Sequence, residues 1–359
     1  MAFVFVFAAS FLVSLVLTPL AGRLGLRLAI ADEPGGRRRH TGRVSRLGGV
    51  ALFAAFMAGL AVMQLLPAPI RPATNDPNEA TRLLGVALGC VFVFAAGIWD
   101  DARELPSWPQ FAVQVIAAGI AMLFLIFIEV INNPLTNRQI WFPWYVTIPV
   151  TLFWIMGAMN TVNFLDGLDG LAAGVTAIAA LLLTVHMVRE GQHSVALLPL
   201  ALLGSTLGFL PYNFHPARVF MGSGGSYFLG FALGTLSIVA GGKVATLLLV
   251  LGIPIMDVAW QMVARIRRGQ PIGQGDRGHL HFRLADMGWS QRRIVLAYYA
   301  FCALFGGLAL LISTRLYKLI ALLVLAGLAT AVFVWASRRG GPAGVGRMEG
   351  QADADEREG

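Results

Sequence analysis

The sequence predicts an all-α polytopic membrane protein with about eleven transmembrane helices. Of its 359 residues, 57% are hydrophobic and only 13% are charged, and the mean hydropathy is +0.71. Soluble domains carry about 25% charged residues, so a soluble fold of this length is excluded. The apolar residues also gather in runs of about 17–22, each long enough to cross a hydrocarbon core of ~30 Å. These runs leave no room for a separate soluble domain.

The predicted spans follow one another along the chain. They cover residues 2–22, 47–66, 83–99, 110–131, 144–161, 168–187, 195–212, 225–241, 244–263, 293–313 and 316–336. We interpret the first as a retained span, because it lacks the charged n-region and the small-residue cleavage site of a signal peptide. Residues 1–336 are therefore expected to form one integral membrane domain. Residues 337–359, rich in Gly, Asp and Glu, are expected to form a disordered cytoplasmic tail.

An odd number of spans places the two termini on opposite sides, and positive charge orients them. Of the 27 Lys and Arg residues, 20 fall in loops on one side and seven on the other. Loops rich in Lys and Arg stay in the cytoplasm, so we expect the N-terminus outside and the C-terminus inside. The net charge of +8 is then a property of these loops, and no nucleic-acid partner is expected. Cys90 and Cys302 lie in apolar runs and are expected to pack rather than to form a disulfide.

Two adjacent carboxylates mark the end of the third predicted span, in the string WDDARELP. Asp100 and Asp101 repel each other unless a cation or a divalent metal neutralises them. Carboxylates kept at the edge of a membrane commonly act on ions or substrates. The alternative is a solvated helix end at which an aspartate caps the next helix.

The most specific polar pattern is NTVNFLDGLDG, between the fifth and sixth spans. Asn160, Asn163, Asp166 and Asp169 recur at intervals of three, which on a helix keeps their side chains near one face. Oxygen ligands of this kind suit a hard cation such as Mg²⁺. A polar turn is the alternative, but capping needs one such residue rather than four. The pattern therefore predicts a metal-assisted site at the cytoplasmic surface of the membrane.

Two further segments could bind phosphate. The string ADEPGGRRRHTGRVSRLGG, which contains Arg46, is either plain cytoplasmic charge or a cradle for phosphate oxygens. The string VFMGSGGSYFLG can present backbone N–H groups to an anion at the start of a helix. Glycine-rich turns between membrane helices are common, so the second signal is weak alone.

Histidines and an aspartate supply the last candidates. In GDRGHLHFRL, His279 and His281 could bind a metal or donate hydrogen bonds to phosphate, or the segment could be an ordinary polar loop. Asp257 lies near the inner end of the ninth span. It either belongs to the site or pairs structurally with Arg265 nearby.

Taken in order, these strings resemble the polyprenyl-phosphate N-acetylhexosamine-1-phosphate transferases, glycosyltransferase family 4. The resemblance runs from about Asp32 to Arg283. The family pattern D-x-P-x-x-R-K-x-H…R-x-G-G is matched by Asp32, Pro34, Arg37, His40, Arg46, Gly48 and Gly49, with Arg38 in place of Lys. Its D-D-x-x-x-L is matched by Asp100, Asp101 and Leu105, its N-x-x-N-x-x-D-G-x-D-G-L from Asn160 to Leu171, and its L-G-x-P-I-x-D from Leu251 to Asp257. The histidine string is closer to the N-acetylglucosamine branch than to the peptidoglycan branch.

The resemblance implies a reaction at the cytoplasmic face of a bacterial cytoplasmic membrane. A UDP-N-acetylhexosamine, with UDP-GlcNAc expected, would pass its sugar 1-phosphate to undecaprenyl phosphate and release UMP. This would be the first membrane step of a cell-surface glycan such as teichoic acid or lipopolysaccharide. The implied cofactor is Mg²⁺, with Mn²⁺ as a substitute. The lipid bilayer is a partner, and the oligomeric state is left open, a homodimer included.

The resemblance also implies a role for each candidate residue. Asp100 would hold or deprotonate the lipid phosphate with support from Asp101, while Asp166 and Asp169 would shape the nucleotide and metal site. Asn163 would be a metal ligand. The implied substrate-binding residues are Arg46, Asn160, Asp257, His279, His281 and Arg283.

Two departures from the family pattern fall in the same site. Ser223 stands where the family's F-M-G-D-x-G-S has an aspartate that helps to hold Mg²⁺, and a neutral hydroxyl is a poor ligand for this ion. Phe282 replaces one histidine of H-x-H-H. Both changes favour a second hypothesis, an impaired relative that binds nucleotide sugar or lipid phosphate without turnover. A third, an ion-coupled transporter, is disfavoured because the carboxylates cluster at one face rather than at the midplane.

Overall fold

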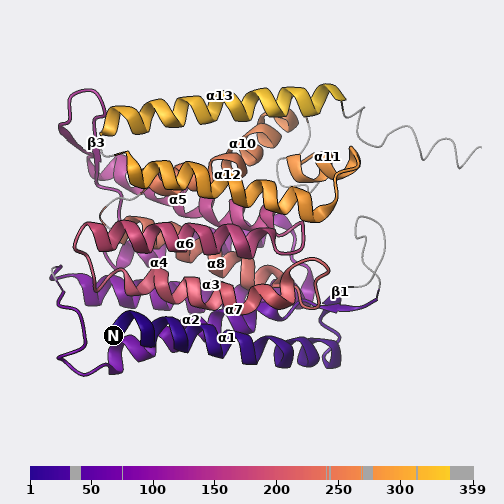
Figure 1. Cartoon of the computed structure of the whole chain (residues 1–359), viewed down its shortest axis with the longest axis horizontal. Helices are drawn as coiled ribbons and strands as arrows, with labels where there is room; N and C mark the ends of the chain where they lie inside the picture. The colour runs from indigo at the N-terminus through magenta and orange to yellow at the C-terminus, as the bar shows by residue number, and fades with distance from the viewer. Residues whose placement is uncertain are drawn as a thin grey trace, which may run out of the picture.

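The fold is a bundle of long helices whose axes run side by side, as a computed structural model of the chain shows (Figure 1). It describes residues 1–32, 42–74, 76–239, 241, 244–267, 269, 278–312 and 314–339, with side chains up to residue 336. The helices are α1 (Ala2–Arg27), α2 (Gly48–Leu65), α3 (Glu79–Arg103), α4 (Ser107–Leu123), α5 (Trp144–Leu165), α6 (Leu171–Arg189), α7 (Leu197–Asn213), α8 (Gly222–Val239), α9 (Val244–Val250), α10 (Gly252–Arg267), α11 (Leu280–Asp286), α12 (Gln291–Leu311) and α13 (Arg315–Arg339).

Two short antiparallel strand pairs lie at opposite ends of the bundle (Figure 1). At one end β1 (Ala31–Asp32) pairs with β2 (Val44–Ser45). At the other end β3 (Val130–Asn132) and β4 (Gln139–Trp141) form a hairpin in which Ile131 faces Ile140. The chain starts at the end that carries β3, and α13 finishes at the end that carries β1. The strand pairs thus label the two ends of the molecule.

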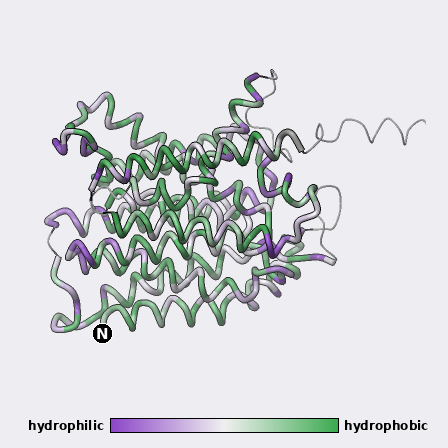
Figure 2. The backbone as a smooth tube through the Cα atoms, turned by 45° about the horizontal axis from the view of Figure 1, so that its top comes forward, coloured by the Kyte–Doolittle hydropathy of each residue, from purple (hydrophilic) through white to green (hydrophobic). Residues whose placement is uncertain are grey.

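The distribution of hydropathy identifies the chain as an all-α polytopic membrane protein. Figure 2 shows apolar residues along the bodies of the helices and hydrophilic residues near the bundle ends. In the described part of the chain, seven helices are long and apolar enough to cross a membrane, or eight if the bent pair α9 and α10 counts as one span. Helices α4 and α7, at 17 residues each, are shorter. Every predicted apolar segment overlaps a helix, but the count of eleven spans stays a prediction.

Three boundaries differ from those expected. Helix α3 continues to Arg103, so Asp100 and Asp101 lie in its last turn rather than after it. Helix α4 ends at Leu123, and the predicted span 110–131 is wrong in its last part, because Val130 already belongs to the β3–β4 hairpin. The ninth segment is broken at Leu251 into α9 and α10, whose axes differ by 78°. A bend of this size turns α10 away from the direction of α9.

Helix α8 forms the centre of the bundle and carries the candidate site at its N-terminus. It packs against α2, α3, α5, α6, α7 and α9, and each of its residues except Ser223 is buried. Figure 1 shows it enclosed by the other helices. Large side chains such as Phe228 and Phe231 fill the space around it. A central helix fixed on all sides gives its N-terminal residues a defined position.

Small residues allow α1, α2 and α7 to approach closely. Ser10 and Ser14 of α1 are fully buried, and the Ser14 hydroxyl donates to the carbonyl oxygen of Ser205 at 2.6 Å. A side chain on Gly204 or Gly208 would collide with the backbone of α1. Helices in lipid associate through such small residues, because lipid tails provide no hydrophobic drive between them. The two expected packing cysteines, Cys90 and Cys302, are both buried and free, as predicted.

Candidate active site

The candidate site lies at the end of the bundle that carries β1 and α11 (Figure 1). Hydrogen bonds join the end of α3 to the start of α8 and α5 to α8. The loop between α5 and α6 lies against α11. Motifs from distant parts of the sequence therefore meet at one end of the molecule.

Asp101 caps the N-terminus of α8. Its Oδ1 accepts a hydrogen bond from the Ser223 N–H at 2.8 Å, and its Oδ2 accepts one from the Gly224 N–H at 3.0 Å. A carboxylate at this position is stabilised by the positive end of the helix dipole. Gly222 has φ +66°, and a side chain there would come within 2.5 Å of the Asp101 Oδ2. The anion that the sequence predicts at this N-terminus is thus supplied by the chain itself.

A short backbone ladder holds the segment before α2 against the segment before α8. The Phe220 N–H donates to the Ser45 carbonyl at 2.8 Å, and the Gly48 N–H donates to the Phe220 carbonyl at 2.9 Å. The Gly49 N–H donates to the Met221 carbonyl at 2.9 Å. The two motifs R-x-G-G and F-M-G are therefore one structural unit.

Arg46 is the cation that this unit presents to the site. Its Nε lies 3.9 Å from the Asp101 Oδ1, and its Nη1 bonds to the Glu104 Oε1 at 3.3 Å. The Arg46 side chain is 22% exposed, so it remains accessible from the end of the bundle. It can offset part of the negative charge gathered there.

Asp100 fixes the turn between α3 and α4. Its Oδ1 accepts hydrogen bonds from the Leu105 N–H at 2.9 Å and from the Gln110 Nε2 at 3.1 Å. Glu104 makes the turn in the left-handed region, with φ +49°. Among the described residues, no hydrogen bond engages the Asp100 Oδ2. Asp100 therefore holds the turn and keeps one oxygen available, whereas the alternative of a solvated helix end that caps the next helix is wrong, because Asp100 is buried and, in the described part of the chain, no side chain caps α4.

Asn160 faces α4 rather than the other polar residues of its motif. Its amide and that of Gln114 form a reciprocal pair, with N···O distances of 2.7 and 3.0 Å. Its Nδ2 also donates to the Met156 carbonyl at 2.9 Å. Helix α5 ends at Leu165, so the expectation of four residues along one helical face is wrong. The predicted substrate-binding residue Asn160 is engaged in joining α5 to α4.

Asn163 lies beside the N-terminal turn of α8. The Ser226 hydroxyl donates to the Asn163 Oδ1 at 2.9 Å and lies 3.4 Å from the Ser223 carbonyl oxygen. A single hydroxyl group thus separates the predicted metal ligand from the position at which the family pattern has an aspartate.

Asp166 is a carboxylate without a direct partner. It caps the C-terminus of α5, and within the described residues its side chain takes part in no hydrogen bond or ion pair. Burial raises its pKa well above the usual value. The charges of Asp101 and Asp169 raise the pKa further, and Arg46 opposes them. A carboxylate in this position is stabilised by any cation that enters.

Asp169 ties the loop between α7 and α8 to the loop between α5 and α6. Its Oδ2 accepts a hydrogen bond from the Ala217 N–H at 3.0 Å and lies 2.8 Å from the Nδ1 of His215. The Nε of Arg292 donates to the His215 carbonyl at 3.2 Å. Asp169 thus positions backbone around the site through one of its oxygens.

Asp257 holds the start of α11. Its Oδ1 accepts from the Leu280 N–H at 3.0 Å, and its Oδ2 lies 3.1 Å from the His279 Nδ1. The His279 ring also packs against Phe164, with a centroid distance of 4.9 Å. A carboxylate on one ring nitrogen fixes which nitrogen carries the proton. Asp257 therefore orients His279, as a member of the candidate site.

His281 is buried, and within the described residues neither ring nitrogen makes a hydrogen bond, although the Nδ1 lies 4.0 Å from the Asp257 Oδ2. A side chain on Gly167 would come within 2.7 Å of its Nε2, so the ring faces the loop that carries Asp166. Burial lowers the pKa of His281 to about 4, the charge of His279 adds to this effect, and Asp257 opposes it. The ring is neutral at pH 7. Because buried polar groups normally have partners, an orphaned ring in a site points to a ligand.

The remaining predicted residues lie near this cluster or outside the described part. Arg283, in α11, donates from its Nε to the Gly278 carbonyl at 2.6 Å. Several residues of the predicted motifs lie outside the described residues, namely Pro34, Arg37, Arg38 and His40.

The donor set fits a hard cation such as Mg²⁺ only if a ligand supplies further oxygens. Within the described residues, no three His, Cys, Asp or Glu side chains form a metal-binding group. Magnesium seldom needs one, because it is usually bound by one or two carboxylates together with waters and substrate phosphates. Asp166 offers a carboxylate with no direct partner in the described part of the chain, and the Asn163 amide oxygen lies one helical turn before it.

Comparison with known proteins identifies the family. The family profile of glycosyl transferase family 4 matches residues 83–241. A Bacillus subtilis protein named "Probable undecaprenyl-phosphate N-acetylglucosaminyl 1-phosphate transferase" is 32% identical over 320 residues, which cover 86% of this chain and 84% of that protein. The chain belongs to glycosyl transferase family 4.

Two other relatives show the range of this family. The decaprenyl-phosphate N-acetylglucosaminephosphotransferase of Mycobacterium leprae is 32% identical, over 79% of this chain and 76% of its own. The phospho-N-acetylmuramoyl-pentapeptide-transferase of Moorella thermoacetica is 34% identical, over 80% of this chain and 91% of its own. These three relatives are all named as transferases, so the comparisons do not favour a non-catalytic role.

The sequence reasoning missed several residues that support the site. Ser226 binds Asn163, and a helical spacing of three from Ser223 could have pointed to it. Gln110 and Gln114 contact Asp100 and Asn160 from α4. No sequence pattern pointed to His215. Its contact with Asp169 joins two loops that are 46 residues apart in the sequence.

Proposed function

We propose that this chain transfers an N-acetylhexosamine 1-phosphate, with GlcNAc 1-phosphate as the expected group, from a UDP-sugar to undecaprenyl phosphate. The observation that carries the proposal is the convergence at one end of the bundle of Asp100, Asp166 and His281, each with unused hydrogen-bonding capacity among the described residues. Membership of a family whose relatives act, by their names, on polyprenyl phosphates supports it.

In the proposed reaction an oxygen of the lipid phosphate attacks the β-phosphorus of the UDP-sugar. The bond from that phosphorus to the oxygen bridging it to UMP breaks, UMP leaves with the bonding electrons, and a lipid-linked sugar diphosphate remains. The Oδ2 of Asp100 would hold the lipid phosphate or accept its proton. A lipid phosphate is already largely ionised at neutral pH, so positioning is the larger contribution. Asp101 would act indirectly, through its cap on α8.

The diphosphate brings negative charge to a site that already holds several carboxylates. Asn163 and Asp166 would hold Mg²⁺, with Ser223 at the edge of its site, and the ion would offset the charge that develops on the phosphate oxygens. The neutral ring of His281 has one N–H that can donate to a phosphate oxygen, and His279, whose Nδ1 proton faces Asp257, would bind the substrate as an acceptor at Nε2. Arg46 and Arg283 add positive charge.

A turnover assay on the purified full-length chain tests this function. The substrates are UDP-GlcNAc or UDP-GalNAc with undecaprenyl phosphate, in Mg²⁺ or Mn²⁺, and the products are UMP and the lipid-linked sugar diphosphate. We expect turnover with UDP-GlcNAc that requires the metal. Tight binding of the UDP-sugar with no UMP release, in the wild type and in Ser223→Asp alike, would instead support the impaired relative.

We further propose that the site faces the cytoplasm, with the N-terminus outside. The asymmetric distribution of Lys and Arg supports this orientation. Reporter fusions after Arg339 and in the loop near Asn75, a residue outside the described ranges, test it. The first reporter should be cytoplasmic and the second external. Finding both on one side would overturn the eleven-span topology.

A further inference from the structure

Asn213, the last residue of α7, joins two segments of the chain that frame the candidate site. Its Oδ1 accepts a hydrogen bond from the Gly170 N–H at 3.2 Å, and its Nδ2 donates to the Val219 carbonyl at 3.1 Å. Gly170 ends the loop between α5 and α6, and Val219 lies in the segment that leads into α8. Asn213 is only 2% exposed, so bulk water does not compete for these bonds.

The two backbone groups require a donor and an acceptor from one short side chain. The Gly170 N–H can only donate and the Val219 carbonyl can only accept, so the orientation of the Asn213 amide is fixed. An ionised carboxylate would have no hydrogen for the Val219 carbonyl, and an aliphatic side chain would serve neither group. Glutamine is one methylene longer. A neutral amide of the length of asparagine therefore meets both requirements.

Gly170 is held from its carbonyl side as well. Its carbonyl accepts hydrogen bonds from the Tyr299 hydroxyl of α12 and, at 3.0 Å, from the Gly174 N–H. With φ +81°, it is the residue at which the chain turns from the loop into α6. Residues 166–169 form the short stretch between the end of α5 and Gly170. Because both ends of this stretch are fixed, the carboxyl of Asp166 has a defined position.

The Val219 side of the bridge leads to the other half of the site. Phe220, the next residue, donates its N–H to strand β2, which directly precedes Arg46. Ser223 follows in the first turn of α8. Asn213 thus sets the distance between this half of the site and the loop between α5 and α6.

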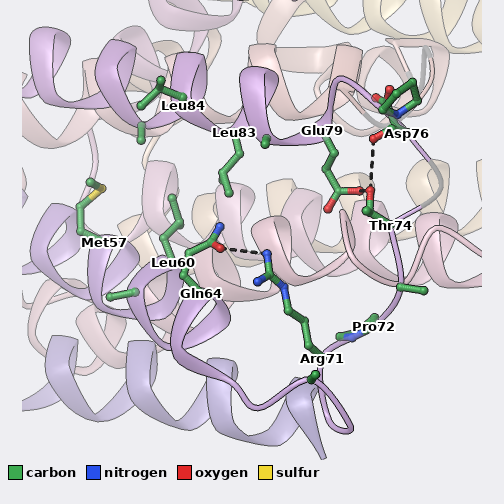
Figure 3. Close-up of a pocket in the computed structure, with 16 residues that line it drawn as sticks. Met57, Leu60, Gln64, Arg71, Pro72, Thr74, Asp76, Glu79, Leu83 and Leu84 are labelled. Carbon is green, nitrogen blue, oxygen red and sulfur yellow. Dashed lines mark hydrogen bonds between the residues drawn. The ribbon is translucent and has the colours of Figure 1, made fainter.

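A side-chain bridge also exists at the opposite end of the bundle (Figure 3). There the Glu79 carboxylate accepts hydrogen bonds from Thr74 and, at 2.8 Å, from Ser194. It lines a groove of about 790 Å³ between α2 and α3 that shares no residue with the candidate site. A bridge by itself is therefore no mark of function. The bridge at Asn213 differs because both of its partners lie in segments that carry candidate site residues.

We propose that Asn213 is a positioning residue of the transfer reaction proposed above, on which this inference rests. Its amide holds the loop between α5 and α6 at the distance from the start of α8 at which Asp166, Arg46 and Ser223 face one substrate. Asn213 acts through the backbone of these two segments and not on the substrate itself. Without it, the loop would have to be ordered each time the substrate binds, and the rate would fall.

Steady-state turnover of the purified full-length chain, measured from about pH 6 to about pH 9, tests this role in two variants. Asn213→Leu keeps a similar volume and removes both hydrogen bonds, so its rate should fall about tenfold or more at every pH. Asn213→Asp keeps the acceptor, but its carboxyl can donate to the Val219 carbonyl only when it is protonated. Its rate relative to the wild type should therefore rise as the pH falls. Asp169 and His215 titrate nearby in both proteins, so this ratio cancels their contribution.

Thr151→Val is the matched control. The fully buried Thr151 hydroxyl accepts from the Ile128 N–H at 3.0 Å and donates to the Thr147 carbonyl at 2.7 Å. This change also removes a donor and an acceptor from two backbone groups, and its rate should equal that of the wild type. The role would be overturned by a loss in Thr151→Val as large as that in Asn213→Leu. It would also be overturned by a wild-type rate in Asn213→Leu, or by an Asn213→Asp rate that stays equally far below the wild type at every pH.

Hydrogen–deuterium exchange of the same proteins without substrate separates this proposal from the proposed function. The Gly170 N–H should exchange about tenfold faster or more in Asn213→Leu, because it loses its bond to the side chain, and at the wild-type rate in Thr151→Val. Unchanged exchange in Asn213→Leu would overturn the bridge, whether or not the chain transfers a sugar phosphate. A wild type that gives no turnover would instead reject the proposed function, and with it the catalytic consequence of the bridge.

Discussion

The two ends of the bundle both carry buried or half-buried carboxylates, but only at one end do all of these carboxylates have hydrogen-bond or ion-pair partners. At the end that carries β3, Asp76 pairs with Arg82 and Glu79 accepts from two hydroxyl groups, Thr74 and Ser194. At the end that carries β1, Asp166 has no direct partner in the described part of the chain, and its neighbours include two further carboxylates.

This difference separates structural carboxylates from those that await a ligand. Leaving a buried donor or acceptor unpaired costs about 1–3 kcal/mol, so several unpaired titratable groups gathered at one end of the bundle point to a ligand. His281, which faces the loop that carries Asp166, also makes no hydrogen bond in the described part of the chain.

The largest expected effect is the loss of a carboxylate at the catalytic end. Asp100→Asn should lower turnover on the order of 10²-fold or more, because a proton acceptor or positioning group typically contributes 10²–10⁴-fold. Its matched control is Glu190→Gln, an exposed carboxylate that follows α6 at the opposite end. Steady-state rates with a fixed UDP-sugar measure both. Equal losses in the two variants would erase the distinction between the ends.

The second effect is a pH dependence of folding stability, which arises from His281 at the end of the bundle that carries the candidate site. His281 has a pKa of about 4 in the folded chain against an ordinary 6.5. Between these values the unfolded chain binds more protons, so folding stability falls as the pH falls through this window. From pH 7 to pH 4 the loss at this residue should be about 3 kcal/mol.

Thermal unfolding of the full-length chain in detergent at pH 4 to 7 measures this loss. His281→Gln removes the titrating ring, so its stability should change less steeply with pH than that of the wild type. Identical slopes for the two proteins would show that His281 is not held neutral by burial.

The third effect concerns the metal. Ser223→Asp places a carboxylate one hydroxyl group away from Asn163, and charged ligands raise the affinity of a site for hard cations. The Mg²⁺ concentration for half-maximal turnover should fall about tenfold, equivalent to ~1.4 kcal/mol. Ser223→Asn adds a similar volume without charge and should leave the requirement near that of the wild type. An unchanged requirement in Ser223→Asp would remove residue 223 from the metal site.

The elements of the fold were predictable from the sequence because apolar runs of this length indicate helices that can cross a hydrocarbon core. The break at Leu251 was not predicted, although Gly252 and Pro254 stand where α10 begins. A proline in the first turn of a helix starts it without losing a hydrogen bond, so this pair was a readable signal. The early end of α4 depends on the β3–β4 hairpin, which an apolar run cannot reveal.

The candidate site was predictable in its residue types but not in its contacts. The sequence indicated that carboxylates and histidines gather at one membrane face, since that follows from counting spans. It could not show that Asp101 caps α8, because Asp101 and Ser223 are 122 residues apart. Nor could it show that Asn160 turns toward Gln114. Such pairings depend on how the helices pack, and the spacing of residues within one motif does not predict them.

The smallest expected effect compares one serine from each end. Ser194 donates to the Glu79 carboxylate and Ser226 donates to the Asn163 amide oxygen, at 2.8 and 2.9 Å. Ser194→Ala removes one hydrogen bond, and Ser226→Ala removes one together with a weaker 3.4 Å contact to the Ser223 carbonyl oxygen, so each should lower the free energy of unfolding by about 1 kcal/mol. Denaturant titration measures this loss.

The two variants should differ in turnover. Ser194→Ala leaves the catalytic end intact, and its rate at saturating Mg²⁺ should equal that of the wild type. Ser226→Ala frees the Asn163 side chain beside the metal site, and its rate at low Mg²⁺ should fall by about tenfold, because a ligand that is no longer held in place must be ordered when the ion binds. The contrary result is a fall of turnover in Ser194→Ala as large as that in Ser226→Ala. That result would mean that the two ends are coupled, and that a carboxylate with all its hydrogen bonds made inside the chain is not thereby purely structural.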